Sequence, residues 1–108
     1  MIGSKVYFQP RDYILGAIHD IKETQKGRGT SFDVEKGKIS FVVDLYSQEC
    51  EFLFTVADIG KNRCKVDIGI LGDVKNREEK IIREYTFLDS MIAANTQIEF
   101  ISSDKGTH

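Results

Sequence analysis

The sequence is poor in the residues that mark several specialised classes of protein. It contains one proline, which excludes a proline-rich recognition segment, and two cysteines, which are too few for a disulfide scaffold. Its longest apolar runs fall far short of the roughly 20 residues that a membrane-spanning helix needs. The first ten residues, MIGSKVYFQP, lack the apolar core of a secretory signal. We therefore expect a cytoplasmic protein with no membrane partner.

Neither sign of charge dominates the sequence. Lys and Arg total 15 against 17 Asp and Glu, which gives a net charge of -2. Binding to duplex nucleic acid depends on clustered positive charge, so no such partner is expected. The 108 residues are 41% hydrophobic and 30% charged, which is typical of one globular domain. We assign residues 1–101 to a single domain and the small, polar residues 102–108 to a disordered tail.

Two segments carry apolar residues at helical spacing. The first helix is expected over about 11–26, beginning near Pro10 and closed by Gly27 in the left-handed conformation. A second and stronger helix is expected over about 77–94, with an apolar stripe on one face. A last short strand is expected at 97–101.

Four segments in the centre of the chain alternate apolar and polar residues, and a fifth short strand precedes the first helix at 5–9. Directly opposed residues of an antiparallel pair point to the same face. We therefore pair Leu45 with Cys50, Phe54 with Val66 and Val34 with Ile39, and residues 46–49 then form a hairpin loop. The centre is predicted to be a four-stranded antiparallel meander.

The expected order of elements is β-α-β-β-β-β-α. Each helix has one apolar stripe and the sheet has one apolar face, so both helices are expected on that face, in an α+β two-layer sandwich. In order and size, residues 6–94 resemble the TATA-binding-protein-like, or helix-grip, architecture, a group that includes the START and birch-pollen-allergen lipid-binding superfamily. The resemblance is one of topology. It implies the sandwich fold and carries no functional residue.

The groups most often used in catalysis do not form a recognisable arrangement. Cys50 and Cys64 fall on the apolar face of the sheet, where a free thiol behaves as a small hydrophobic group. His19 falls on the polar side of the first helix, away from any nucleophile. The glycines of residues 26–31 follow a helix, whereas a phosphate-binding loop precedes one. We therefore predict no catalytic residue and no cofactor.

One acidic group lies on the outer face of the predicted sheet. In the predicted register Asp44 lies opposite Glu51, and Asp67 lies diagonally from Glu51. Opposed like charges destabilise a sheet, and a bound Mg²⁺ or Ca²⁺ would offset them. The three carboxylates are a weak candidate metal site, to be weighed against an ordinary solvated face.

Apolar residues on the same outer face predict a contact surface. The residues concerned are Val42, Tyr46, Leu53 and Leu71. An open sheet face is usually more polar than this, and the commonest partner is a second copy of the chain. The sequence therefore predicts a small non-enzymatic interaction or structural module, homodimeric through its open sheet face or an edge.

The helix-grip resemblance supplies the alternative, a carrier of a small apolar ligand held between the sheet and the C-terminal helix. The residues that would contact such a ligand are Phe41, Phe52, Phe54, Ile81, Tyr85 and Leu88. The same side chains are explained equally well as the hydrophobic core.

Overall fold

The computed structural model describes the backbone of residues 3–106 and the side chains of residues 3–93. The elements in chain order are β1 (Lys5–Tyr7), α1 (Arg11–Thr24), β2 (Arg28–Asp33), β3 (Lys38–Leu45), β4 (Gln48–Gly60), β5 (Arg63–Leu71) and α2 (Arg77–Gly106). The predicted order of elements is confirmed up to α2.

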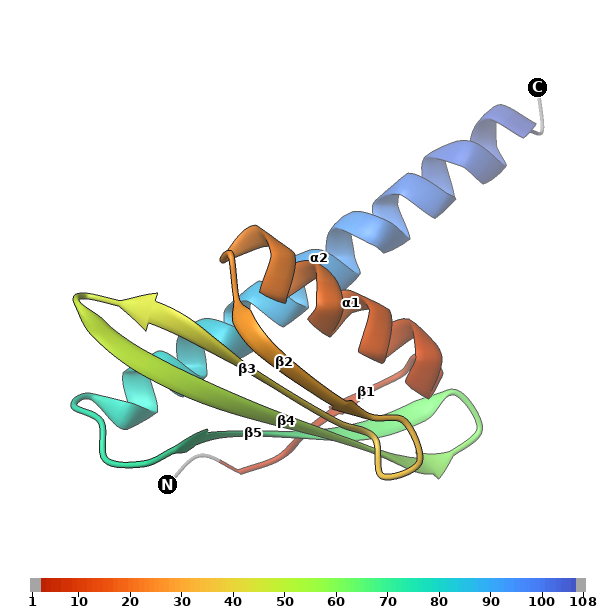
Figure 1. Cartoon of the computed structure of the whole chain (residues 1–108). Coiled ribbons are helices and arrows are strands. Elements are labelled where there is room, and N and C mark those ends of the chain that lie inside the picture. Colours follow the sequence, from red (N-terminus) through yellow and green to blue (C-terminus); the bar gives the residue numbers. More distant parts are fainter. Residues whose placement is uncertain (1–2, 107–108) are drawn as a thin grey trace.

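The five strands form one antiparallel sheet in the order β1-β5-β4-β3-β2. Strands β2 to β5 are the predicted meander, and β1 pairs with the other side of β5. Both helices lie on the same face of this sheet (Figure 1). Helix α1 contacts β3, β4 and β5, while α2 contacts β5 and α1. The predicted α+β sandwich, with both helices on one face, is confirmed.

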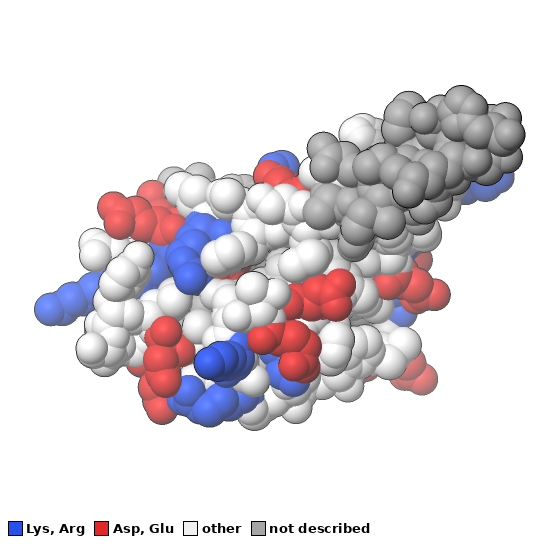
Figure 2. All heavy atoms as spheres, turned by 90° about the horizontal axis from the view of Figure 1, so that it is seen from above, with Lys and Arg blue, Asp and Glu red and all other residues white. Residues whose placement is uncertain are grey.

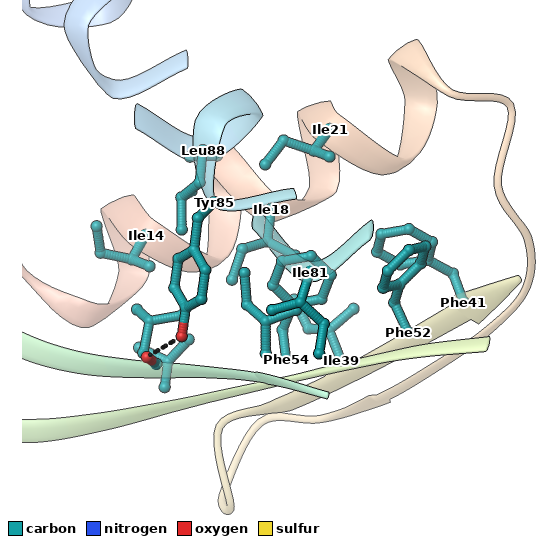
Figure 3. Close-up of a cluster of buried hydrophobic side chains, with 14 of the residues drawn as sticks. Ile14, Ile18, Ile21, Ile39, Phe41, Phe52, Phe54, Ile81, Tyr85 and Leu88 are labelled. Carbon is teal, nitrogen blue, oxygen red and sulfur yellow. Dashed lines mark hydrogen bonds between the residues drawn. The ribbon is translucent and has the colours of Figure 1, made fainter. Parts of the chain in front are cut away.

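The core lies between the helices and the inner face of β3, β4 and β5. Phe41, Phe52 and Phe54 are fully buried there, and Phe41 lies against both other rings, with centroids 6.3 Å from Phe52 and 5.4 Å from Phe54. The side chains that the helices contribute include Ile14, Ile18, Ile21, Ile81, Tyr85 and Leu88 (Figure 3). Burying a large apolar side chain contributes about 1.5–3 kcal/mol, so this layer supplies much of the stability.

The edge strand β2 departs from the predicted burial pattern. Phe32 is on the inner face, opposite Ile39, but its exposed fraction is 48%. Val34, which was predicted to pair with Ile39, lies past the end of β2 and is exposed in the turn. The reason is that α1 covers β3 to β5 and does not contact β2. Alternation therefore gives the correct face for Phe32, but a face is buried only where a helix covers it.

The pairing of the strands differs from the prediction by two residues at each hairpin. Leu45 pairs with Gln48 rather than with Cys50. Phe54 pairs with Ile68 rather than with Val66, and Ile39 pairs with Phe32 rather than with Val34. Side-chain direction repeats every two residues, so a shift of two leaves each strand residue facing the predicted side.

The corrected register shortens the β3–β4 connection to two residues. Tyr46 and Ser47 have φ angles of 52° and 65°, the two positive values that define a type I′ turn. Such turns favour Asn and Gly, because most other residues are strained at positive φ. Neither is present here, which is why the sequence indicated a longer loop.

Helix α1 ends at Thr24, before the predicted end at residue 26. Lys26 takes the left-handed conformation, with φ of 57°, that was expected of Gly27. The N–H of Gly27 donates to the Lys22 carbonyl at 2.9 Å, and the N–H of Lys26 donates to the Glu23 carbonyl at 3.1 Å, which is a Schellman motif. Gly27 is needed for a different reason. A Cβ atom there would lie 3.0 Å from Cδ1 of the buried Phe41.

Helix α2 extends well past the predicted end at residue 94. It continues to Gly106, so the strand predicted at 97–101 is wrong. The helix also includes residues 102–106 of the predicted tail, while 107 and 108 lie outside the described residues. Figure 1 shows the C-terminal half of α2 projecting beyond the sheet. Within the described part of the chain, neither helix has the length and apolarity to cross a membrane.

Candidate functional site

The outer face of the sheet is open, since both helices cover the opposite face (Figure 1). Val42 and Leu53, two of the predicted contact residues, are half-buried at its centre, and Leu71 is exposed on β5. In the observed register Val42 lies opposite Glu51, and Leu53 lies between Ser40 and Gly69. The apolar surface is therefore centred on Leu53, with Val42 diagonal to it.

Tyr46, the fourth predicted contact residue, belongs to a different surface. It lies in the β3–β4 turn, where its exposed fraction is 86%. There it lines a pocket with residues from the start of α2. The predicted contact set is thus divided between the open face and this pocket.

Charge on the open face is distributed unevenly along the strands. A row without charged side chains crosses four strands, through Ser31, Ser40, Leu53 and Gly69. On one side of this neutral row lie three carboxylates and one guanidinium, from Asp44, Glu49, Glu51 and Arg28. On the other side lie three cations and two carboxylates, from Lys38, Arg63, Lys65, Asp33 and Asp67. One half of the face thus has an excess of negative charge and the other an excess of positive charge.

The helix-covered side differs in this respect, because acidic and basic side chains are interspersed on it (Figure 2). The separation of charge is therefore a property of the open face.

The predicted acidic trio does not assemble. Asp44 lies opposite Glu49 rather than Glu51, and Asp67 lies opposite Thr55 and accepts a hydrogen bond from the Ser4 hydroxyl. No group of three potential metal-ligating side chains occurs among the described residues.

The opposed carboxylates of Asp44 and Glu49 are offset by a side chain from the edge strand. Arg28 donates to both oxygens of Asp44, at 2.8 and 3.3 Å, and to Glu49 at 2.9 Å. Arg28 comes from the glycine-containing segment 26–31, most of which forms β2. The expected compensation for opposed like charges exists, and it is supplied by a guanidinium.

The six residues of the alternative ligand site lie together in the core described above (Figure 3). Leu88 is fully buried between the layers, and the Tyr85 hydroxyl donates to the Val66 carbonyl at 2.9 Å. The structure therefore gives these residues a packing role.

Both thiols are buried and free. Burial raises the pKa of the Cys50 thiol, and burial together with the neighbouring Asp58 carboxylate raises the pKa of the Cys64 thiol to about 11. Both groups therefore stay protonated near neutral pH, which makes them poor nucleophiles. His19 is exposed on α1, with its Nε2 atom 3.7 Å from Glu23. These placements confirm the predicted structural cysteines and surface histidine.

A pocket of about 230 Å³ lies between the β3–β4 turn and the start of α2, and we call it the α2 pocket. Its lining residues are Tyr46, Gln48, Lys75, Asn76, Glu79, Lys80 and Arg83. Three of these carry positive charge and one carries negative charge. The pocket was not anticipated from the sequence, because its two walls come from segments about thirty residues apart.

Lys80 is the most deeply buried residue of this lining, with an exposed fraction of 6%. Its ammonium group donates to the side-chain oxygen of Gln48 at 2.8 Å and to the carbonyl of Lys75 at 2.7 Å. Both acceptors are neutral. No described carboxylate forms an ion pair with Lys80.

A second buried charge lies one helical turn further along α2. Glu84 is fully buried, and it accepts hydrogen bonds from Gln25 at 2.6 Å and from Arg83 at 3.0 Å. Arg83 also donates to Gln25 at 2.5 Å, so the three side chains connect the end of α1 to α2. Burial raises the pKa of the Glu84 carboxyl, although the bonds from Gln25 and Arg83 oppose this shift.

Comparison of the sequence with protein-family models and with curated proteins gives no match.

Proposed function

We propose that this chain is a non-enzymatic interaction module that forms a homodimer through the open face of its sheet. The observation that carries the proposal is the distribution of charge about the neutral row of Ser31, Ser40, Leu53 and Gly69. A surface that binds a copy of itself about a two-fold axis has to be complementary to itself.

A two-fold axis along the neutral row, perpendicular to the strands, satisfies this requirement. The rotation places the acidic half of one face over the basic half of the other. It brings the two copies of Leu53 together on the axis, and Arg28 over Asp33 of the second copy. An axis parallel to the strands would instead superpose halves of like charge. The charge pattern therefore favours one dimer geometry over the other.

The size of the face is also sufficient. Five strands spaced about 4.8 Å apart give a width of about 24 Å. The eight residues of β3 give a length of about 26 Å. The resulting area of roughly 600 Å² on each copy places the dimer at the lower end of specific interfaces, which begin near 1,200 Å² in total.

The face is a better contact surface than the sheet edges. Strand β1 has only three residues. Strand β2 is interrupted by a bulge between Arg28 and Ser31, and bulges at edges prevent pairing with a further strand. We therefore place the interface on the face.

The non-enzymatic part of the proposal follows from where the reactive groups lie. The two thiols are buried and protonated, and the one described histidine is a surface residue. Buried free thiols are also typical of a reducing compartment, so we propose a cytoplasmic location.

Sedimentation velocity of the wild type and of Leu53→Lys tests the dimer. We expect the wild type to sediment with twice the monomer mass of 12.3 kDa. Leu53→Lys brings two like charges together on the axis and should give a monomer. Ile82→Lys is the matched control. It also replaces an aliphatic residue with lysine, at an exposed position of α2, and should leave the dimer intact.

Two results would contradict the proposal. The first is a wild-type monomer at concentrations up to about 1 mM, at which even a weak specific dimer would form. The second is a Leu53→Lys variant that dimerises as well as Ile82→Lys does.

The carrier of a small apolar ligand, which the helix-grip resemblance implies, is the less favoured proposal. Phe41 lies 5.4 Å from Phe54 between ring centroids, and both rings are fully buried. A ligand between sheet and helix would have to separate such contacts. Native mass spectrometry of freshly purified protein distinguishes the two functions, because a carrier retains an added mass on the monomer.

A further inference from the structure

The ammonium group of Lys80 is a buried charge, among the described residues, that only neutral acceptors hold. The residue is 6% exposed, and both hydrogen-bond acceptors that hold it, Gln48 and the Lys75 carbonyl, are neutral. An ammonium group has three N–H donors, and these two contacts use two of them. The third has no acceptor among the described residues.

A buried charge without a counter-ion is costly. Removing a charge from water costs several kcal/mol, and folded proteins offset this by pairing the charge. Glu84, one turn further along the same helix, already binds Gln25 and Arg83. The Cys50 thiol beneath is protonated, because burial raises its pKa, so it provides no negative charge either. The protein thus holds a cation in the wall of a pocket and does not neutralise it.

The surroundings of Lys80 are suited to an anion from outside. Lys75 and Arg83 line the same α2 pocket, and Arg83 has five N–H donors, only part of which bind Gln25 and Glu84. The pocket also includes Asn76, directly before the first residue of α2. Backbone N–H groups in the first turn of a helix have no partner within the helix, and the helix dipole is positive there.

We propose that the α2 pocket binds the oxyanion group of a small organic phosphate or carboxylate, with Lys80 as its main counter-charge. The volume of about 230 Å³ corresponds to about seven water molecules, which is enough for an oxyanion and a small organic group. Glu79 is the one carboxylate of the lining, and it would accept a hydrogen bond from a hydroxyl of the ligand. The exposed Tyr46 ring at the turn offers a flat surface for the organic part.

The proposal is tested by NMR titration of the ¹⁵N-labelled chain with phenyl phosphate, benzoate and benzyl alcohol. We expect saturable shifts at the backbone amides of Gln48, Asn76 and Lys80 with one or both anions. The neutral alcohol should cause none. The phosphate and carboxylate arms identify which oxyanion the pocket prefers.

Two variants separate binding in the pocket from general attraction of anions. Lys80→Met keeps the length of the side chain and removes its charge, so affinity should fall about tenfold or more, as a charge-assisted hydrogen bond is lost. Lys36→Gln, the matched control, removes an exposed cation from the β2–β3 turn and should bind as the wild type does.

The melting temperature of Lys80→Met distinguishes loss of the binding site from loss of folding. Because it removes an unneutralised buried charge, the free variant should melt at a temperature equal to or higher than that of the wild type. It should also no longer be stabilised by the anion, whereas the wild type should be.

The proposal is overturned if neither anion gives saturable shifts at the three amides of the wild type. It is also overturned if Lys80→Met and Lys36→Gln bind the anion equally well. Both results are independent of the dimer, because the same titration can be made on the monomeric Leu53→Lys variant.

Discussion

Buried tyrosine hydroxyls show how single polar atoms are treated in this core. The Tyr85 hydroxyl donates to the Val66 carbonyl at 2.9 Å. The Tyr13 hydroxyl is the one buried side-chain polar atom without a hydrogen-bond partner among the described residues. A buried polar group that lacks a partner costs about 1–3 kcal/mol, so these two residues should respond differently to loss of the hydroxyl.

We predict that Tyr13→Phe leaves the free energy of unfolding unchanged or raises it by up to about 1 kcal/mol, because no bond is lost. Tyr85→Phe should lower it by about 1 kcal/mol, because a buried bond is lost. Urea unfolding of both variants beside the wild type measures the difference. Equal destabilisation by the two changes would show that the Tyr13 hydroxyl has a partner in solution.

Glu84 is predicted to make stability fall as pH rises. Burial raises the pKa of this carboxyl in the folded state above the value of 4.5 that it has when exposed. At pH values below 4.5 the group is protonated in both states and carries no penalty. Above that value the unfolded chain releases the proton first, so the free energy of unfolding declines until the folded-state pKa is passed.

Glu84→Gln should remove this decline, since the amide does not titrate and can still accept the bond from Gln25. The measurement is the melting temperature from about pH 4 to 8, a range that starts near the ordinary glutamate pKa. Glu79→Gln, an exposed change on the same helix, serves as the control and should keep the wild-type slope. If Glu84→Gln keeps that slope too, Glu84 is not its source.

At the scale of elements, the turns fix how the strands align. Gly37 in the β2–β3 turn and Gly29 in β2 have nearly the same positive φ, 65° and 62°. They differ in their surroundings, since a Cβ atom at Gly37 would overlap the Val56 carbonyl oxygen and one at Gly29 would meet open space. The pair therefore separates backbone strain from steric overlap.

We predict that Gly29→Ala lowers the free energy of unfolding by about 1 kcal/mol, the cost of a side chain in the left-handed conformation. Gly37→Ala should lower it by about 2–4 kcal/mol, because overpacking against β4 is added to the same strain. Chemical denaturation of both variants provides the test. Similar losses would mean that the turn moves away from Val56 without cost.

The same turns explain how far the sequence could predict the fold. Alternation with a period of two assigned Phe41, Phe52 and Phe54 to the inner face, and all three are buried there. It could not assign the register, because a shift of two residues leaves every side chain on the same face of the sheet. The register depends on the turn, and Tyr46 with Ser47 form a type I′ turn without the Asn or Gly that would reveal one.

The candidate sites were predictable only in part, for the same reason. Leu53 was assigned correctly to the open face, because this assignment depends only on the direction of its side chain and not on the register. The acidic trio was wrong because it depended on which residues lie opposite one another. The α2 pocket requires both the two-residue turn that places Tyr46 and the packing of α2 beside it, and neither leaves a local pattern in the sequence.

At the scale of the whole molecule, the sheet has one covered face and one open face with separated charge. In the proposed dimer, the acidic half with Glu49 and Glu51 faces the basic half with Lys38 and Lys65. Opposed charges of this kind orient the two copies and speed their association. Their attraction weakens as salt screens the charges. The dimer should therefore dissociate more readily at high ionic strength.

Charge reversal tests directly whether the charges of the open face hold the two copies together. Glu49→Lys combined with Glu51→Lys makes both halves of the face basic, and Lys38→Glu combined with Lys65→Glu makes both halves acidic. Each double variant should be monomeric on its own, because any two-fold pairing then opposes like charges. An equimolar mixture should form a heterodimer, because each basic half again meets an acidic one.

Sedimentation velocity at low ionic strength measures all three samples under the same conditions. The mixture is the decisive sample. If the substitutions damaged the fold of either variant, the mixture would be monomeric, as each variant is on its own. Dimers in the mixture alone would establish that the two open faces meet and that their charges determine the association. A homodimer of either double variant would show that the open face is not the contact surface, or that its charges do not determine how the copies are arranged.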